Sequence, residues 1–225
     1  MLIAAANLAV ALAVSPAGEP AVPPVSPMPP MIVIVSAASD LSPRMLSLLL
    51  AETDAIWRAI GVRFLWQWEG AASSVVRGRI SSERPYGSPS LRVVIGHEPH
   101  AVQDRRYALG WIMFDDPATP EQEIHISYDN AISLLEQSPG VVGVLQNMPL
   151  LQREILLGRA MGRALAHELG HYLSASKAHA PKGLMMAVHT AAEFFGPDRE
   201  RFTLDLEERQ RIVARFTSIY MASRG

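Results

Sequence analysis

The chain has 225 residues and no cysteine, which excludes a disulfide framework, a thiolate nucleophile and cysteine metal ligands. Its formal net charge is -2 at pH 7, so the composition predicts no nucleic-acid partner. Hydrophobic residues make up 49% of the chain, which is enough for the core of one globular domain. A transition metal would have to be held by carboxylates or by some of the seven histidines.

The first thirty residues differ in composition from the rest. Residues 1–14 are apolar and rich in alanine and leucine, which predicts the hydrophobic region of a secretory signal peptide, although the first basic residue is Arg44. They are too few to cross a bilayer comfortably, so we expect no stable membrane span in the mature protein. Residues 15–30 are proline-rich and predict an extended linker. We therefore expect a secreted or periplasmic protein whose folded domain covers residues 31–225.

The first part of this domain alternates strand and helix patterns. Residues 31–35 form a continuous β-branched run, typical of a strand buried on both faces. Ser42 and Pro43 predict the start of a helix whose apolar spacing continues to a stop at Gly61. Strands are predicted at residues 62–68 and 91–95. The polar, glycine- and proline-rich residues 71–90 between them predict a loop.

The second part ends in helices. We predict strands at residues 108–114 and 123–128, the latter half-exposed, and a short helix at 129–137. A long helix is predicted from about Asn147 and Pro149 to about residue 173. A C-terminal helix at about 206–221 begins with the capping-box pair Asp205 and Glu208. This order predicts an α+β fold, with a mixed sheet packed on the long helix and a small C-terminal helical part.

The long helix contains His167-Glu168-Leu169-Gly170-His171. Two histidines four residues apart project from one face of a helix and can bind one zinc ion. The intervening Glu168 is then placed to activate a water molecule at the metal.

A catalytic zinc usually takes three protein ligands and leaves one position for water. Three residues are candidates for the third ligand, and their types and spacing do not decide among them. His179 lies eight positions beyond His171, past the predicted end of the helix. Glu193 would give a site of two histidines and one glutamate, of the gluzincin type, and His189 is the other alternative.

His167-Glu168-Leu169-Gly170-His171, then His179, then Gly183-Leu184-Met185, resembles the metzincin metalloproteases, and the matrixin branch most. The family pattern continues with a glycine, a third histidine and a methionine turn. Met185 lies 18 positions after His167, which matches the matrixin interval. The sequence departs from the pattern because Ser174 replaces the glycine, Lys177 takes the third-histidine position and His179 is displaced by two residues.

The resemblance implies a zincin/metzincin-like domain over residues 31–225, whose mixed sheet packs on a long active-site helix. It implies a zinc ion held by His167, His171 and His179, with Met185 beneath the three imidazoles. It also implies that Glu168 is the catalytic base. In the family, the edge strand above the cleft pairs with extended substrate, which gives residues 108–114, with Gly110, that role here.

The function we expect is zinc-dependent hydrolysis of peptide bonds by metal-activated water, in a secreted endopeptidase with peptide or protein substrates. The alternatives are a catalytically degenerate zinc-binding protein, a gluzincin-type peptidase with Glu193 as third ligand, and a helix whose histidines bind no metal. His97 and His100 are interpreted as solvated loop residues, and His125 as lying on the polar face of its strand. The sequence predicts neither the cleavage specificity nor the oligomeric state.

Overall fold

The computed structural model describes residues 30–69, 91–97 and 108–222. The predicted signal segment, nearly all of the linker, the loop at 71–90 and His100 lie outside the described residues. Among the helices in the described ranges, none combines the length and apolar character that a membrane span requires.

Five strands form one mixed sheet, as predicted. They are β1 (Met31–Ala37), β2 (Phe64–Trp68), β3 (Leu91–Gly96), β4 (Gly110–Asp116) and β5 (Thr119–Ser127). Their order across the sheet is β2-β1-β3-β5-β4. The first four strands in this order are parallel, and β4 runs antiparallel to β5 at one edge.

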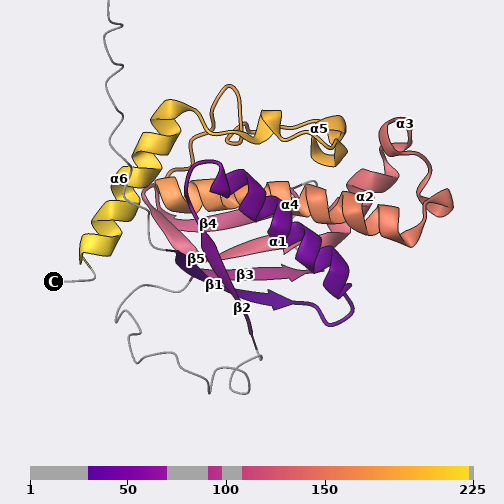
Figure 1. Cartoon of the computed structure of the whole chain (residues 1–225), viewed down its shortest axis with the longest axis horizontal. Helices are drawn as coiled ribbons and strands as arrows, with labels where there is room; N and C mark the ends of the chain where they lie inside the picture. The colour runs from indigo at the N-terminus through magenta and orange to yellow at the C-terminus, as the bar shows by residue number, and fades with distance from the viewer. Residues whose placement is uncertain (1–29, 70–90, 98–107, 223–225) are drawn as a thin grey trace, which may run out of the picture.

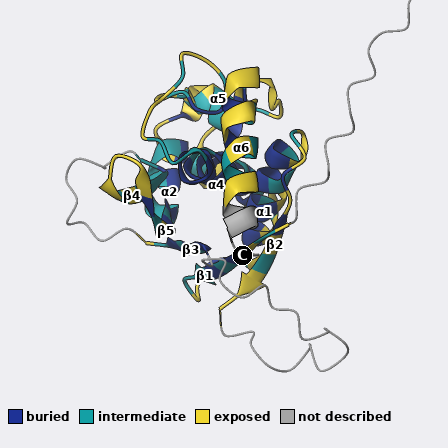
Figure 2. Ribbon diagram, turned by 90° about the vertical axis from the view of Figure 1, so that its left-hand side faces the viewer, coloured by how far each residue is buried: buried dark blue, intermediate teal, exposed yellow. Residues whose placement is uncertain are grey.

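Four of the strands, β1, β2, β3 and β5, are buried on one face, and β4 has no fully buried residue. In β1, Val33 and Val35 are fully buried, whereas Ile32, on the other face of the strand, is 37% exposed. The prediction that residues 31–35 are buried on both faces is therefore wrong. The reason is architectural: α1 and α4 lie on one side of the sheet, and Figure 2 shows no described helix on the other.

The helices of the first half are α1 (Pro43–Arg58), α2 (Tyr128–Glu136) and the single-turn α3 (Pro139–Val142), followed by a 3-10 turn, η2 (Leu145–Asn147). Ser42 caps α1 as predicted, its hydroxyl accepting from the backbone of Met45 with Pro43 in the first turn. The helix ends at Arg58, before the predicted stop. Gly61, with φ 84°, instead turns the chain toward β2.

The second half contains α4 (Leu150–Ser174), α5 (Ala191–Phe195), the 3-10 turn η3 (Glu200–Phe202) and α6 (Leu206–Ala222). The sequence analysis did not predict α5, which the reciprocal capping box of Thr190 and Glu193 starts. Figures 1 and 2 both show α5 on the side of α4 that faces away from the sheet. The part of α4 from Leu156 to Leu173 is therefore buried almost all round, because it lies between the sheet with α1 and the C-terminal elements.

A buried ion pair joins these layers one turn before the histidine motif. Arg163 of α4 is fully buried, and its Nε lies 2.9 Å from a carboxylate oxygen of Glu52 in α1. Arg199, from the C-terminal segment, binds the other oxygen of Glu52 at 2.6 Å. Arg163 also donates to the carbonyls of Asp198 and Phe194. The cluster thus ties α1, α4 and the segment after α5 together.

Candidate metal centre

His167 and His171 lie on the same face of the last turns of α4, and backbone carbonyls hold both rings. Nδ1 of His167 is 2.7 Å from the carbonyl oxygen of Leu184, and Nδ1 of His171 is 2.6 Å from that of Ser176. A carbonyl oxygen can only accept, so each Nδ1 carries the proton. The lone pair of each ring is then on Nε2, and the two Nε2 atoms face each other at 3.0 Å.

The chain reverses directly after α4 by a left-handed residue. Ala175 adopts φ 48° and ψ 47°, and among described residues it is the one non-glycine with positive φ. The backbone N–H of Ser176 donates to the carbonyl of His171, while the carbonyl of Ser176 accepts from the His171 ring. The reversal that a glycine performs in the metzincin pattern is therefore made here by alanine, one position after Ser174.

This reversal brings His179 back to the pair on the helix. One nitrogen from each of His167, His171 and His179 can be chosen so that all three lie within 4.8 Å of one another. The ring of His179 stacks on that of His167 with centroids 5.4 Å apart and is perpendicular to that of His171 at 4.9 Å. Among the described residues, these three histidines are the one group of three or more histidine or carboxylate side chains close enough together to hold a metal ion.

The donor set fits a zinc ion. Tetrahedral zinc with Zn–N bonds of about 2.0–2.1 Å places its nitrogen ligands roughly 3.4 Å apart, between the 3.0 Å of the helical pair and the 4.8 Å limit of the group. Burial, followed by the nearby His171 ring, lowers the pKa of His167 to about 3. Burial also lowers the pKa of His171. Both rings are therefore neutral at pH 7, which is the form that binds metal.

Met185 forms the floor of the group. It is buried, and a methyl group added at Gly170 would come within 2.2 Å of its sulfur, so the thioether packs directly on the helix between the two histidines. The turn before it depends on Gly183, which has φ 80° and whose added methyl would meet the carbonyl oxygen of Thr203 at 2.3 Å. The N–H of Leu184 donates to that same oxygen at 2.8 Å.

Glu168 faces the edge of the sheet from α4 and is 8% exposed. A methyl group added at Gly110 would lie 3.1 Å from its Cγ, so the start of β4 runs directly past this carboxylate side chain. Within the described sheet, β4 pairs with β5 and is the last strand at this end, so Glu168 lies against the start of the edge strand.

The other candidate ligands lie elsewhere. Glu193 is used in the capping box of α5, where Thr190 donates to it. The side chain of His189 is buried, its ring stacks on Phe202 at 4.5 Å, and its Nδ1 lies 3.7 Å from a carboxylate oxygen of Glu193. Lys177 points toward β4, with its amine 5.1 Å from the centre of the Phe114 ring.

Two histidines interpreted as surface residues are half-exposed but paired. His97 lies between Asp129 at 2.6 Å and Asp40 at 3.0 Å, and hydrogen bonds to these carboxylates, Asp129 first, raise the pKa of His97. His125 lies on the half-exposed face of β5 as predicted, and stacks on Trp111 with centroids 5.0 Å apart.

Sequence reasoning missed the groups that orient the ligands. The carbonyls of Leu184 and Ser176 carry no residue-type signal, because every residue has one. The left-handed conformation of Ala175 also gives no signal in the sequence, since the residues that usually mark it are glycine and asparagine.

Comparison with protein-family models finds no match, and neither does comparison with curated proteins. Among solved structures, the crystal structure of archaemetzincin from Methanopyrus kandleri is similar to this chain with a TM-score of 0.46. The two are 16% identical, and the alignment covers 84% of this chain and 96% of that one.

Proposed function

We propose that this protein is a zinc-dependent peptidase in which His167, His171 and His179 hold the metal and Glu168 is the general base. The observation that carries the proposal is the convergence of the three imidazoles, two of them fixed by carbonyls so that their Nε2 lone pairs face each other. Two unprotonated Nε2 atoms at 3.0 Å repel each other, and a metal ion bound by both rings would replace this repulsion with two coordination bonds.

Zinc, when bound, lowers the pKa of a coordinated water and polarises a carbonyl group. Glu168 supplies what the metal does not. It lies one residue from a ligand, on the side of α4 that faces β4, and from there it takes a proton from the attacking water and returns it to the leaving amine. Its low exposure keeps this proton transfer away from bulk solvent.

The edge strand β4 supports peptides as the substrate class. An extended peptide can add to an edge strand through main-chain hydrogen bonds. Gly110 brings the backbone of β4 to Glu168 with no intervening side chain, so a peptide paired with the strand passes directly in front of the base. A bulkier residue at this point would push Glu168 or the neighbouring Ile126 aside.

The metal is tested by zinc content after purification without chelator. We expect close to one zinc per wild-type chain, and strongly reduced zinc in His167→Ala, His171→Ala and His179→Ala. His97→Ala is the matched control, because that histidine is bound by two aspartates instead. Zinc retained in all three variants would contradict the ligand assignment.

Catalysis is tested with Glu168→Gln and a broad peptide library read by mass spectrometry. The variant should keep its zinc and lose about 10²–10⁴-fold in turnover, the usual contribution of a general base. Zinc without cleavage in the wild type would instead identify a zinc-binding protein without hydrolysis. The positions of the cuts test the prediction of an endopeptidase, and export from the cell stays a prediction.

A further inference from the structure

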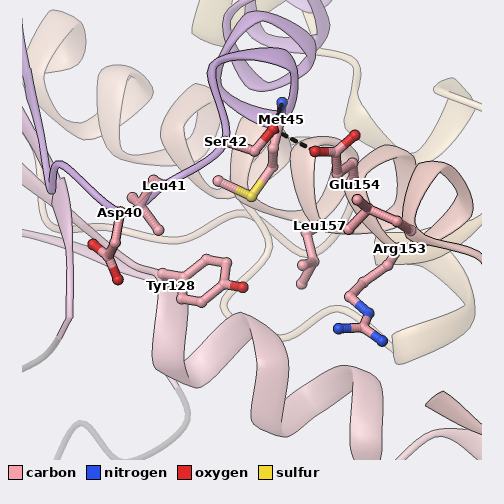
Figure 3. A pocket seen from close by; sticks show the side chains of 9 residues that line it. Asp40, Leu41, Ser42, Met45, Tyr128, Arg153, Glu154 and Leu157 are labelled. Atoms are coloured by element: carbon pink, nitrogen blue, oxygen red, sulfur yellow. Dashed lines mark hydrogen bonds between the residues drawn. The ribbon is translucent and has the colours of Figure 1, made fainter. Parts of the chain in front are cut away.

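A cavity lies at the end of α4 that is opposite the histidine group. It has a volume of about 190 Å³ and is formed by the segment after β1, the start of α2 and the first two turns of α4 (Figure 3). The strands β1, β3 and β5 end side by side next to it, at Ala37, Gly96 and Ser127. The crevice at the carboxyl ends of parallel strands is where open α/β sheets bind ligands.

Two hydrogen-bond donors without partners line this cavity. Arg153 is half-buried, its Nε is sealed from solvent with no acceptor, and its guanidinium group has no ion pair with a described residue. The hydroxyl group of Tyr128 also has no hydrogen bond to a described residue. Figure 3 shows both groups below the cavity, and the Ser42–Glu154 hydrogen bond above it. A half-buried guanidinium group without a counter-charge among the described residues favours an anion at this position.

The acidic groups nearby are already engaged. Glu154 accepts from the Ser42 hydroxyl and lies 3.8 Å from Arg44. Asp40 is bound by His97 at 3.0 Å. Neither carboxylate therefore neutralises Arg153.

The rest of the lining is consistent with an anion that has an apolar body. Leu150 is the first residue of α4, and this 25-residue helix has no side-chain N-cap, because Pro149 takes that position. Its free N–H groups add a positive partial charge beside Arg153. Leu41, Met45 and Leu157 are buried and form the apolar wall, while Leu150 is 67% exposed at the mouth.

We propose that this cavity binds a small organic carboxylate, with the carboxylate between Arg153 and Tyr128 and the apolar part against Leu41, Met45 and Leu157. Arg153 precedes His167 by 14 residues, about 21 Å along a helix. The site is therefore separate from the metal centre and does not depend on the proposed peptidase activity.

The test is a titration of the full chain with N-acetylleucine, followed by protein NMR. We expect saturable shifts at residues lining the cavity. Arg153→Met should raise the Kd about tenfold or more, because it removes a charge-assisted contact. Tyr128→Phe, which removes one oxygen atom, should raise it about threefold to tenfold. The control Arg63→Met removes an exposed arginine elsewhere and should leave the Kd unchanged.

Three further probes decide the ligand class. N-acetylleucinamide has the same apolar body without the charge, and binding as tight as that of N-acetylleucine would overturn the proposal. Tighter binding of inorganic phosphate than of N-acetylleucine would also overturn it, in favour of a simple anion site. Acetyl-Ala-Ala-Leu tests the source: tighter binding than N-acetylleucine identifies a peptide C-terminus, and weaker binding a free small acid. No saturable shift with any carboxylate refutes the site.

Discussion

Two polar clusters lie one turn apart on α4: the cluster around Arg163 is buried, whereas the histidine cluster extends from buried His171 to exposed His179. In the cluster around Arg163, every charge has a partner within the chain: Glu52 receives Arg163 at 2.9 Å and Arg199 at 2.6 Å, and the remaining donors of Arg163 reach carbonyl oxygens. In the histidine cluster, carbonyl oxygens accept from Nδ1 of His167 and His171, whereas the Nε2 lone pairs of these two rings face each other with His179 beside them. The same helix thus carries one cluster that folding completes and a second cluster for which we propose a metal ion.

The largest expected effect is on the self-contained cluster. Arg163→Met leaves Glu52 buried with Arg199 as its one remaining partner, and we expect the free energy of unfolding to fall by about 3 kcal/mol. Because this cluster needs no metal, the loss should be the same with and without zinc. Urea denaturation measures it, with the exposed Arg63→Met as a control that changes stability by less than about 0.5 kcal/mol. A loss seen only with zinc present would show that the two clusters are coupled.

Zinc should stabilise the histidine cluster and leave the other unaffected. At a free concentration 100 times its Kd, a ligand that binds only the native state adds about 2.7 kcal/mol to the free energy of unfolding. His179→Ala should gain much less, because two nitrogens on one helix are an incomplete site. Thermal melts in a zinc buffer, started from chelator-treated protein, measure the gain. No gain in the wild type would contradict the site.

Acid should destabilise the metal-free protein through the same histidines. The pKa of His167 is lowered to about 3 in the folded chain and is about 6.5 in the unfolded chain. Between these values the unfolded state binds more protons, so stability is full above about pH 6.5 and falls as the pH drops toward 3. We expect a loss on the order of 1–2 kcal/mol between pH 7 and pH 5, measured by urea denaturation. His167→Gln should flatten this slope, and an unchanged slope would show that other groups cause it.

The smallest effect is expected at the chain reversal that brings His179 to the metal. The left-handed conformation costs a non-glycine residue about 1–2 kcal/mol. Replacing Ala175 with glycine removes this cost, but part of the gain is lost because glycine has more conformational entropy in the unfolded chain. Ala175→Gly should therefore stabilise the protein by about 0.5–1 kcal/mol in thermal or urea unfolding. Ala214→Gly, on the exposed face of α6, should instead destabilise it by a similar amount. If Ala175→Gly lowered the free energy of unfolding as Ala214→Gly does, the strain at Ala175 would be contradicted.

Local patterns determined most of the elements. The spacing of apolar residues placed α1, α4 and α6 close to their observed bounds, and Ser42 with Pro43 marked the start of α1. The pair of His167 and His171 also follows from sequence, since two residues four apart on a helix must share a face. The short α5 was missed because five residues offer too little periodicity, and the Thr190–Glu193 capping box was its one local signal.

Tertiary structure decided the rest, since it concerns residues distant in the chain. That His179, and not Glu193 or His189, lies with the helical pair depends on the backbone angle at Ala175 and on the docking of the methionine turn against Thr203. Burial of β1 on one face depends on where α1 and α4 pack, which no strand pattern encodes. The cavity at Arg153 likewise joins the segment between β1 and α1, the first turn of α1, the start of α2 and the start of α4. A sequence specifies which side chains share a helix face, whereas three-dimensional packing specifies which loops reach that face.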